Sequence, residues 1–369
     1  MRIIHVASYK DAFFNGIKSV LEELVPGQRS LGHTVIILNH EKNERPVVEG
    51  EHYVHGRNDF KIAVKDFQPD IVVFHSLYNI DDVRFSWYLD SQDIPYLVEP
   101  HGGTTNNNAK KNWLKKKIAN LVYTNRFINK AAGIIYLNPK EADECVFKDY
   151  RRSFAIIPNG TKMHGRPSNA GSKDGKIRFM FLARIDIVHK GLDLLFPAIK
   201  QFNASGFMDK AEFHFYGKAR NPKWKEMFEK FISDSDDNVF FHGPVDGDLK
   251  EDAFLKADVF LLTSRYEGMP MSVLEALSYG LPCLITPQTN MESVIIKGGC
   301  GWLTSTDSDN ITEALIRAMR DYSYQSNKYI ENALKAASGY TWDAICKYSI
   351  DYYSSIINDN ISVPLKSGH

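Results

Sequence analysis

Two cations and a glycine follow an apolar run in the second half of the sequence. The run Ile177–Leu182 reads as a strand. Arg184, Lys190 and Gly191 lie between this run and the next helical pattern. The carboxyl ends of parallel strands and the N-termini of helices are where an open α/β sheet receives phosphate. The segment therefore predicts a phosphate-binding loop, although a solvated basic loop would have the same composition.

Two glutamates form a second candidate. Glu267 follows the apolar run Val259–Thr263. Gly268 permits an unusual backbone turn, and Pro270 suits the first position of a helix. A carboxylate at Glu275, on the flank of that helix, could accept both hydroxyls of a ribose, while Glu267 faces whatever binds at the helix N-terminus. In the alternative interpretation, Glu275 is an exposed residue stabilised by the helix dipole.

A third feature is a basic segment with helical spacing. Residues 100–140 hold eight basic side chains and no acidic one, in a chain whose 45 basic and 45 acidic residues cancel. A basic amphipathic helix with an interfacial tryptophan can lie on an anionic membrane. A helix packed on its own domain, with solvated lysines, would have the same pattern. The residues that would face the membrane and the acceptor are Lys110, Lys111, Trp113, Lys115, Lys116 and Lys117.

Short apolar runs alternate with helical patterns in both halves of the chain. In the first half the runs are Met1–Ser8, His33–Leu38, Asp70–His75, Tyr96–Glu99 and Gly133–Leu137. In the second half they are Ile177–Leu182, Ala211–Tyr216, Val239–Phe241, Val259–Thr263 and Pro282–Thr286. The helical patterns between and after these later runs are Leu192–Phe202, Lys223–Ser233, Asp248–Lys256, Pro270–Tyr279 and Asn310–Arg320. Such alternation predicts βαβ units and a parallel sheet in each half.

A stretch rich in glycine, serine and proline divides the two halves. This stretch, Gly165–Lys176, is the best candidate for a linker. We expect one domain over residues 1–168, a second over residues 176–341, and an amphipathic tail helix over residues 342–358. The predicted fold class is α/β, with two doubly wound, Rossmann-like domains facing a central cleft, a preferred place for a ligand.

Composition narrows the classes of function. The formal net charge is zero, so no whole-chain field attracts nucleic acid. No apolar run approaches the roughly 18 residues that span a bilayer, and the four cysteines include no C-x-x-C pair. The sequence has no G-x-G-x-x-G after the first run and no G-x-x-x-x-G-K-[ST], which argues against a dehydrogenase and a P-loop NTPase. We expect a reduced, cytosolic, soluble protein.

The ordered set of motifs resembles retaining glycosyltransferase family 4, whose members have the two-domain GT-B fold and use nucleotide-sugar donors. EGMPMSVLE, from Glu267 to Glu275, matches the E-x7-E signature of that family. RIDIVHKGLDLL, which begins at Arg184, matches its arginine-then-lysine diphosphate motif. The tail YTWDAICKYSIDYY looks like its closing helix, which crosses back to the N-terminal domain. The resemblance covers nearly the whole chain and is strongest over residues 177–345.

The resemblance implies roles for the matching side chains. Arg184 and Lys190 would neutralise the donor diphosphate. Glu275 would hold the ribose hydroxyls, and Glu267 would hold hydroxyls of the transferred sugar. His101, in EPHGG, matches a family histidine that faces the donor sugar from the first domain. The implied catalytic residues are Glu267, His101, Arg184 and Lys190.

Backbone groups complete the implied donor site. Amides around Gly268 and Met271 would assist at the helix N-terminus, and the backbone of Val245 would meet the base. Gly16 stands where the family usually has two adjacent glycines. We expect no metal or other cofactor, because Arg184 with Lys190 can stabilise a leaving nucleoside diphosphate. Two D-x-D triplets, Asp234–Asp236 and Asp246–Asp248, lie in polar, acidic segments typical of a surface.

The implied activity is that of a retaining hexosyltransferase. It would move a hexose or N-acetylhexosamine from a nucleotide-diphosphate sugar, with a UDP-sugar favoured over a GDP-sugar, to a growing glycan. The acceptor would be a lipid-linked precursor of a surface polysaccharide such as lipopolysaccharide or capsule. The enzyme would be cytoplasmic and peripheral on an anionic membrane, at the inner face of the plasma membrane.

Two alternatives stay open at this point. One is a GT-B relative that acts on the nucleotide sugar itself, as an epimerase does. The other is a nucleotide-sugar-binding protein without catalysis. Glycosylation of an acceptor distinguishes the first alternative, and hydrolysis of a donor distinguishes the second.

Overall fold

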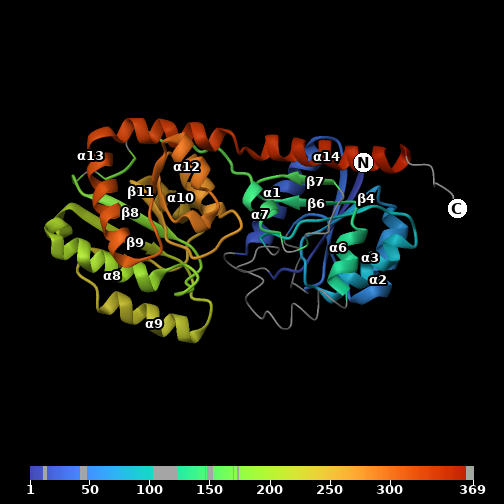
Figure 1. Ribbon diagram of the computed structural model, residues 1–369, viewed down its shortest axis with the longest axis horizontal. Helices are drawn as coiled ribbons and strands as arrows, with labels where there is room; N and C mark the ends of the chain where they lie inside the picture. Colours follow the sequence, from blue (N-terminus) through green and yellow to red (C-terminus); the bar gives the residue numbers. More distant parts are fainter. Residues whose placement is uncertain are drawn as a thin grey trace. The chain divides into compact units, whose positions relative to one another are not determined.

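The computed structural model describes residues 1–10, 15–41, 48–102, 123–145, 147, 153–168, 170–172 and 174–362. The chain forms two compact units. The first comprises Met1–Asn159 with Trp342–His369, and the second comprises Gly160–Thr341. Each unit contains one parallel sheet with helices (Figure 1).

The sheet of the first unit has seven strands in the order β3-β2-β1-β4-β5-β6-β7. Its strands are β1 (Arg2–Ala7), β2 (Thr34–Asn39), β3 (Glu51–Tyr53), β4 (Ile71–Phe74), β5 (Tyr96–Val98), β6 (Gly133–Tyr136) and β7 (Ser153–Ile156). Every residue of β4 and β5 is buried. Central parallel strands are covered on both faces, which explains why they read as continuous apolar runs.

The helices of the first unit connect these strands, and the last one comes from the end of the chain. The described helices are α1 (Gly16–Ser30), α2 (Gly56–Phe67), α3 (Ile80–Asp90), α6 (Asn125–Lys130), α7 (Pro139–Asp143) and α14 (Trp342–Ser362). Helix α14 packs against α1. At their contact, a Cβ added to Gly27 would lie 2.3 Å from Cys346 Sγ, so glycine allows the close approach.

The sheet of the second unit has six strands in the order β10-β9-β8-β11-β12-β13. Its strands are β8 (Ile177–Leu182), β9 (Ala211–Tyr216), β10 (Val239–Phe241), β11 (Val259–Leu262), β12 (Cys283–Ile285) and β13 (Gly301–Leu303). Its α-helices are α8 (Leu192–Phe202), α9 (Pro222–Ser233), α10 (Gly247–Lys256), α11 (Met271–Ser278), α12 (Glu292–Gly298) and α13 (Ser308–Ser338). Three further segments are short helices: the π-helix η2 (Asn203–Phe207) and the 3-10 helices η3 (Met208–Lys210) and η4 (Pro287–Thr289). Helix α13 packs against α8 and α11.

The predicted α/β class with two parallel, doubly wound sheets is confirmed. The stretch that we expected to be a linker is instead bonded to the second unit. In the stretch Gly165–Lys176, the Gly165 amide donates to Ser278 O at 3.0 Å, and Arg166 Nη2 donates to Ala257 O at 2.5 Å. These bonds attach the stretch to the second unit, because its backbone amide and its arginine donate to carbonyls of that unit.

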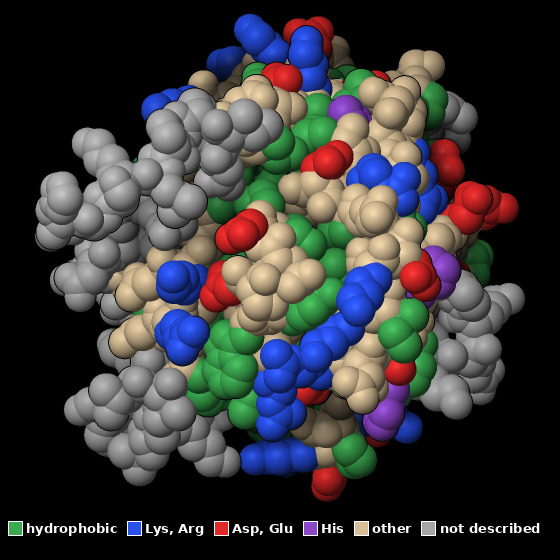
Figure 2. Space-filling view, turned by 90° about the vertical axis from the view of Figure 1, so that its right-hand side faces the viewer, with side chains coloured by type: hydrophobic (Ala, Val, Ile, Leu, Met, Phe, Trp, Pro, Cys, Tyr) green, Lys and Arg blue, Asp and Glu red, His purple; other side chains and the backbone are tan. Residues whose placement is uncertain are grey.

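The described surface carries both signs of charge. On the face shown in Figure 2, basic side chains in blue and acidic side chains in red lie close to one another. Among the described residues, no helix is both long enough and apolar enough to cross a membrane.

Candidate functional site

The loops that follow β8 and β11 emerge at the same edge of the second sheet. The two strands are parallel neighbours, with Val259 opposite Phe179. The strand order reverses between them, because β9 and β10 lie on one side and β12 and β13 on the other. Ligands of open α/β sheets bind at the carboxyl ends of the strands at such a switch point. Both predicted motifs of the second half lie in these two loops.

The two loops are bonded to each other. Thr263 Oγ1 donates to Lys190 O at 3.1 Å, and the Arg265 amide donates to His189 O at 2.9 Å. Gly191 has a φ of 66°, and a Cβ added there would lie 2.2 Å from Thr263 O. Glycine is therefore required at this position both for its backbone conformation and for the approach of the second loop.

An arginine clamp strengthens the same contact. Arg265 Nη1 and Nη2 donate to the two carboxylate oxygens of Asp193, at 2.6 and 2.8 Å. Nη1 also donates to Val188 O at 2.6 Å. A bidentate pair of this kind fixes geometry as well as charge. The clamp joins the β11 loop to both the β8 loop and the first turn of α8.

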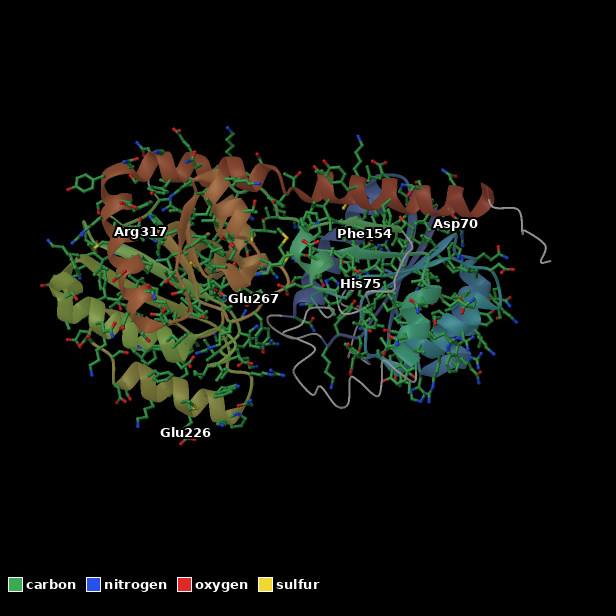
Figure 3. The ribbon with its side chains drawn as sticks, viewed as in Figure 1. Asp70, His75, Phe154, Glu226, Glu267 and Arg317 are labelled. Carbon is green, nitrogen blue, oxygen red and sulfur yellow. The ribbon has the colours of Figure 1, made fainter. Side chains whose placement is uncertain are left out.

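An ion pair between Lys190 and Glu267 lies where the loops meet. Lys190 Nζ donates to Glu267 Oε1, and the side chains are only 10% and 12% exposed. Ser264 Oγ donates to the same carboxylate oxygen at 2.7 Å. Burial raises the pKa of the Glu267 carboxyl, but Lys190, His189 and Ser264 outweigh it, so the pKa lies below its ordinary value. Glu267 is therefore ionised at neutral pH. Figure 3 shows it among the side chains of the second unit.

The backbone around Glu267 is also held. The Glu267 amide donates to Gln288 O at 2.9 Å. Asn290 Nδ2 donates to Glu267 O at 2.7 Å and to Gly268 O at 3.2 Å. The turn between β11 and α11 is thus fixed from the β12 side, which orients the Glu267 carboxylate.

Two groups of hydrogen-bond donors at this edge have no side-chain acceptor among the described residues: Arg184 Nε and the first amides of α11. Arg184 is half-buried, and its buried Nε has no hydrogen-bond acceptor among the described residues. A buried N–H without an acceptor is unfavourable and is rare in native proteins. Helix α11 begins after Pro270, which supplies no side-chain cap to its first amides. Met271 and Gly268 flank this helix start. Uncapped amides at a helix N-terminus and an unsatisfied guanidinium both favour an anion.

Glu275 and Val245 lie beside helix α10 instead. Lys250 Nζ of α10 forms an ion pair with Glu275 Oε1 at 2.6 Å. Val245, just before α10, lines a cavity of about 300 Å³. Tyr216 and His242 line the same cavity and stack on each other, with ring centroids 4.6 Å apart. The cavity therefore offers a flat aromatic wall next to an aliphatic side chain.

In the first unit, His101 and Gly16 follow strands of the first sheet. Gly16 begins α1, after the N-cap Asn15, and a Cβ added to it would meet no described residue within 4 Å. His101 follows β5 with a φ of 49° and bonds to His75 at the end of β4. Burial lowers the pKa of His101 to about 4, so its imidazole is neutral at pH 7.

One group of described residues has the make-up of a metal site. His75, Glu99 and His101 each offer a ligand atom within 4.8 Å of the others. Within this group, His75 Nδ1 and His101 Nε2 are hydrogen-bonded to each other at 2.9 Å. Within the described part of the chain, neither predicted D-x-D triplet contributes to such a group. The basic cluster Lys110, Lys111, Trp113, Lys115, Lys116 and Lys117 lies outside the described residues.

Sequence reasoning missed most partners of the predicted residues. Ser264 and Asn290 hold Glu267, Lys250 pairs with Glu275, and Arg265 clamps the loops. Arg265 carries a local signal, since it is a cation two residues before Glu267 in the same loop. Nothing in the spacing of the other three residues marks them.

Comparison with known proteins gives matches to both units. The family model described as "Glycosyl transferases group 1" matches residues 176–321. The chain is 24% identical over 333 residues to an uncharacterised 41.2 kDa protein from the cps region of Klebsiella pneumoniae, covering 84% of this chain and 87% of that protein. It is 25% identical over 227 residues to the UDP-Gal:alpha-D-GlcNAc-diphosphoundecaprenol alpha-1,3-galactosyltransferase of Escherichia coli, covering 56% of this chain and 57% of that enzyme.

The structure is similar to that of HepE from Anabaena, solved in complex with UDP. The TM-score is 0.78, the identity is 14%, and the match covers 96% of this chain and 100% of that one. At this identity the likeness concerns the fold. Each parallel-sheet unit therefore has a counterpart in a known two-domain fold.

The interlock of the loops gives a direct prediction. Gly191→Ala should destabilise the protein by about 3 kcal/mol or more, because left-handed strain of about 1–2 kcal/mol adds to a backbone clash. Gly206→Ala is the matched control, since Gly206 also has a positive φ, of 87°, but an added Cβ there meets none of the residues that the structure describes within 4 Å. The free energy of unfolding, measured with urea, should fall much further for Gly191→Ala. Equal losses in the two variants would show that the loops are not interlocked at Gly191.

Proposed function

We propose that the chain is a glycosyltransferase, because it has the GT-B fold and its residues 176–321 match the family model for glycosyl transferases group 1. The enzyme transfers a hexose or N-acetylhexosamine from a nucleoside-diphosphate sugar to a growing glycan, with retention of anomeric configuration. The preferred donor is a UDP-sugar, and the acceptor is a lipid-linked precursor of a surface polysaccharide.

The observation that carries this proposal is the unsatisfied Arg184 beside a buried, ionised pair. Arg184 Nε has no acceptor among the described residues, whereas Lys190 and Glu267 are paired at the switch point of the same sheet. A diphosphate that binds at the start of α11 would supply the missing acceptor. It would also give Lys190 a second anionic neighbour.

The leaving group explains why cations are needed there. When the bond between the sugar and the diphosphate breaks, negative charge develops on the departing oxygen. Fixed cations in a site of low dielectric stabilise this charge without reorganising. We propose that Arg184 and Lys190 do so without a metal, and that the amides near Gly268 and Met271 assist.

The carboxylates of Glu267 and Glu275 would each bind a different sugar of the donor. Glu267 is held ionised and oriented, so it can accept hydrogen bonds from hydroxyls of the transferred sugar. Glu275, the fifth residue of α11, would accept the ribose hydroxyls after exchanging part of its pairing with Lys250. Val245 would meet the base at the cavity that Tyr216 and His242 line.

The first unit would contribute the groups that face the sugar and the acceptor. His101 is neutral at pH 7 and is fixed by a hydrogen bond to His75, which suits a group that orients a substrate without adding charge. Gly16, which has no side chain of its own, would let the donor approach the backbone at the start of α1.

Relatives support the choice of donor and acceptor. The name of the Escherichia coli relative includes a UDP-sugar donor and a diphosphoundecaprenol-linked acceptor, and HepE was solved with UDP. The relative from Klebsiella pneumoniae is named for a cps region. A UDP-sugar and a lipid-linked acceptor are therefore the first substrates to test, and we propose that the enzyme works at the inner face of the plasma membrane.

Arg184→Ala should separate binding chemistry from folding. Because the change removes a buried N–H that has no acceptor, the melting temperature should be unchanged or slightly raised. Donor turnover, measured as release of nucleoside diphosphate, should fall about 100-fold to 1000-fold in kcat/KM. Lys297→Ala, at an exposed lysine of α12, is the control and should keep full activity. Normal turnover by Arg184→Ala at low donor concentration would refute the assignment.

Lys190→Ala should lose stability as well as activity. It leaves the buried Glu267 carboxylate without its main partner, and breaking a buried pair costs about 3–5 kcal/mol. Unfolding in urea, compared with Arg184→Ala, measures the difference. A Lys190→Ala variant as stable as Arg184→Ala would mean that the pair is not formed in solution.

The glutamates should fail in different ways. Glu275→Ala should weaken binding of free nucleoside diphosphate, because two charge-assisted hydrogen bonds worth about 1.5–3 kcal/mol each are lost. Glu267→Gln should bind the nucleotide almost normally but turn over the donor slowly. Titration calorimetry and steady-state kinetics on both variants test this division. The same loss of nucleotide affinity in both would contradict it.

The basic cluster gives a prediction that depends on the sequence alone. Changing Lys110, Lys111, Lys115, Lys116 and Lys117 to Gln should reduce binding to anionic liposomes, since each lysine near such a surface contributes about 1 kcal/mol. Donor hydrolysis in solution should barely change. Added salt should release the unmodified protein from liposomes as well. If the unmodified protein ignores anionic liposomes at low salt, the acceptor is a soluble glycan or a small molecule.

A further inference from the structure

A chain of hydrogen-bonded side chains runs through the first unit from α14 to the loop after β5. Gln28 Nε2 donates to Ser349 Oγ at 3.0 Å, and Gln28 Oε1 lies 2.8 Å from His5 Nε2. His5 Nδ1 lies 2.8 Å from His75 Nε2, and His75 Nδ1 lies 2.9 Å from His101 Nε2. Gln28, His5 and His75 are fully buried. The chain thus joins the last helix to the histidine that we expect to face the sugar.

The α14 end of the chain fixes the orientation of Gln28. The Ser349 hydroxyl has one proton, which it donates to Cys346 O at 2.7 Å. Ser349 Oγ can therefore only accept from Gln28, so the amide nitrogen of Gln28 must face Ser349. Its carbonyl oxygen then faces His5, which makes His5 Nε2 a donor.

This choice propagates through the three imidazoles. A neutral imidazole has one N–H donor and one acceptor nitrogen. Because His5 donates through Nε2, its Nδ1 accepts, and the proton between it and His75 lies on His75 Nε2. His75 Nδ1 then accepts from His101 Nε2. All three histidines are therefore assigned as Nε2–H tautomers.

The surroundings keep the histidines neutral. Burial and, to a smaller extent, the nearby Arg29 lower the pKa of His5 to about 4, although the hydrogen bond that His5 donates to Gln28 acts to raise it. Burial, with His5 and His101, holds the pKa of His75 well below its ordinary value. We call the hydrogen-bonded series Ser349, Gln28, His5, His75 and His101 the relay. With one proton on each imidazole, every hydrogen bond between the rings is donated in the same direction, from His101 towards Gln28.

A carboxyl with a raised pKa lies beside two of these imidazoles. Burial, with Glu141 nearby, raises the pKa of Glu99 to about 8, so the carboxyl keeps its proton at pH 7. Glu99 Oε2 lies 3.3 Å from His75 Nδ1, and Oε1 lies 3.7 Å from His101 Nδ1. A protonated carboxyl suits these nitrogens because it faces acceptors, not N–H groups.

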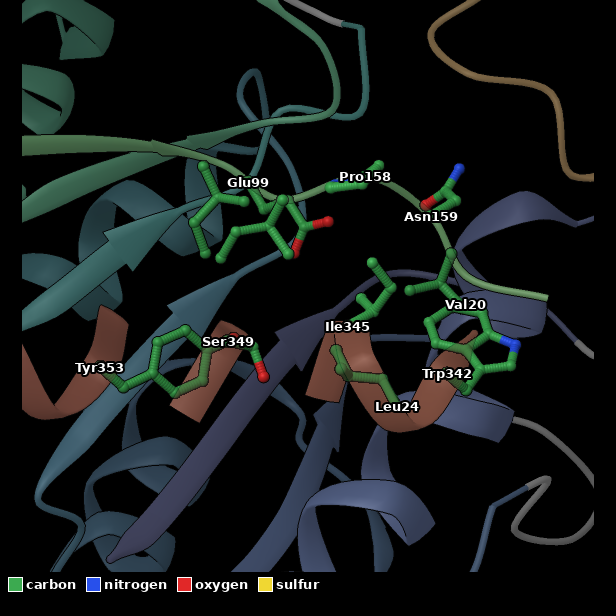
Figure 4. A pocket seen from close by; sticks show the side chains of 11 residues that line it. Val20, Leu24, Glu99, Pro158, Asn159, Trp342, Ile345, Ser349 and Tyr353 are labelled. Atoms are coloured by element: carbon green, nitrogen blue, oxygen red, sulfur yellow. The ribbon is translucent and has the colours of Figure 1, made fainter. Parts of the chain in front are cut away.

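Helix α14 also closes this cluster off from solvent. Figure 4 shows Glu99 across a small cavity from Ser349 and Tyr353 of α14. The cavity measures about 10 Å³, and Trp342 lines its other end. The Tyr353 phenol is fully buried and interacts with Gln28, Ser349 and Glu99. The helix that orients the relay is therefore also the one that buries it.

At the His101 end of the relay, the backbone adopts an unfavourable left-handed conformation. His101 has a φ of 49° and Gly102 a φ of 80°, so two consecutive residues are left-handed. The Gly102 amide donates to Glu141 Oε1 at 2.6 Å. A left-handed residue other than glycine persists only where its surroundings hold it. The His75–His101 bond anchors the ring of that residue.

We propose that Gln28, His5 and His75 are positioning residues that transmit the orientation of α14 to His101, holding it as the neutral Nε2–H tautomer in a fixed left-handed loop. That His101 then orients the donor sugar rests on the proposed function. The tautomers themselves do not, so the two parts can fail separately.

The tautomers are read directly from nitrogen NMR spectra of protein labelled with 15N-histidine. His5, His75 and His101, assigned by single substitutions, should each show a protonated Nε2 and a bare Nδ1 from pH 8 down to about pH 5. A protonated Nδ1 on any of the three in the unmodified protein overturns the proposal. So does a stoichiometric divalent metal in the purified protein that is lost in His75→Ala, because the three side chains would then be ligands.

Ser349→Ala tests the α14 end against a matched control. Without its acceptor, Gln28 can turn over, so the three histidines should become mixtures of tautomers. Ser355→Ala is the control, because Ser355 Oγ makes the same bond to a helix carbonyl, with Tyr352 O at 2.8 Å, but is exposed. It should leave the spectrum unchanged. Uniform Nε2–H tautomers in Ser349→Ala would overturn the role of α14.

Gln28→Glu tests the relay with a charge. A carboxylate beside His5 should raise the pKa of that imidazole by about 1 to 3 units. The acidic limb of the pH profile of kcat should move up with it, while KM for the donor stays constant. Ser349→Ala should lower kcat by about tenfold, also at constant donor KM. If the tautomers change in both variants but kcat and its profile do not, the relay does not act on the reaction. If the unmodified protein turns over no donor, the proposed function fails while the spectra still decide the relay.

Discussion

The site of the second unit depends on one buried contact, the ion pair between Lys190 and Glu267. A buried pair contributes little net stability, but either charge alone would be strongly unfavourable there. Both loops must therefore adopt the conformations that bring the two side chains together. The left-handed Gly191, the Thr263 hydroxyl and the Arg265–Asp193 clamp make that conformation available. The pair then holds a carboxylate ionised at the edge where a sheet of this topology binds its ligand.

Arg184 differs from the other charged side chains at this edge, because its buried Nε has no hydrogen-bond acceptor among the described residues. The charged side chains Lys190, Glu267 and Arg265 of the two loops already form ion pairs within the protein, so they do not need a substrate to neutralise them. A cation with a buried, unbonded N–H gains most from an incoming anion, and the uncapped start of α11 gains in the same way. In the first unit the order is reversed, because buried histidines are kept neutral and carry orientation, not charge. In the proposed reaction, the second unit would stabilise charge and the first unit would position the sugar.

The strands and the residue types of the site could be predicted from the sequence, whereas their partners could not. The runs Ile177–Leu182 and Ala211–Tyr216 form strands with those bounds, and every buried position in them carries an apolar or aromatic side chain. Arg184, Lys190 and Glu267 stand out because they follow such runs. Lys250 and Glu275 lie on different helices, and only folding brings them together. Helix α13 extends far beyond the pattern Asn310–Arg320, and the supposed linker is strapped down by carbonyls that no local pattern reveals.

The central claim is that Lys190 and Glu267 act as one unit. A double-mutant cycle with Lys190→Met, Glu267→Gln and the combined variant tests it, with the initial rate of nucleoside-diphosphate release from a UDP-sugar as the readout. Residues that act as a unit have strongly non-additive effects. The account predicts that the combined variant is no slower than the slower single variant. Losses that multiply in the combined variant would show that the two side chains act independently, and would contradict the account.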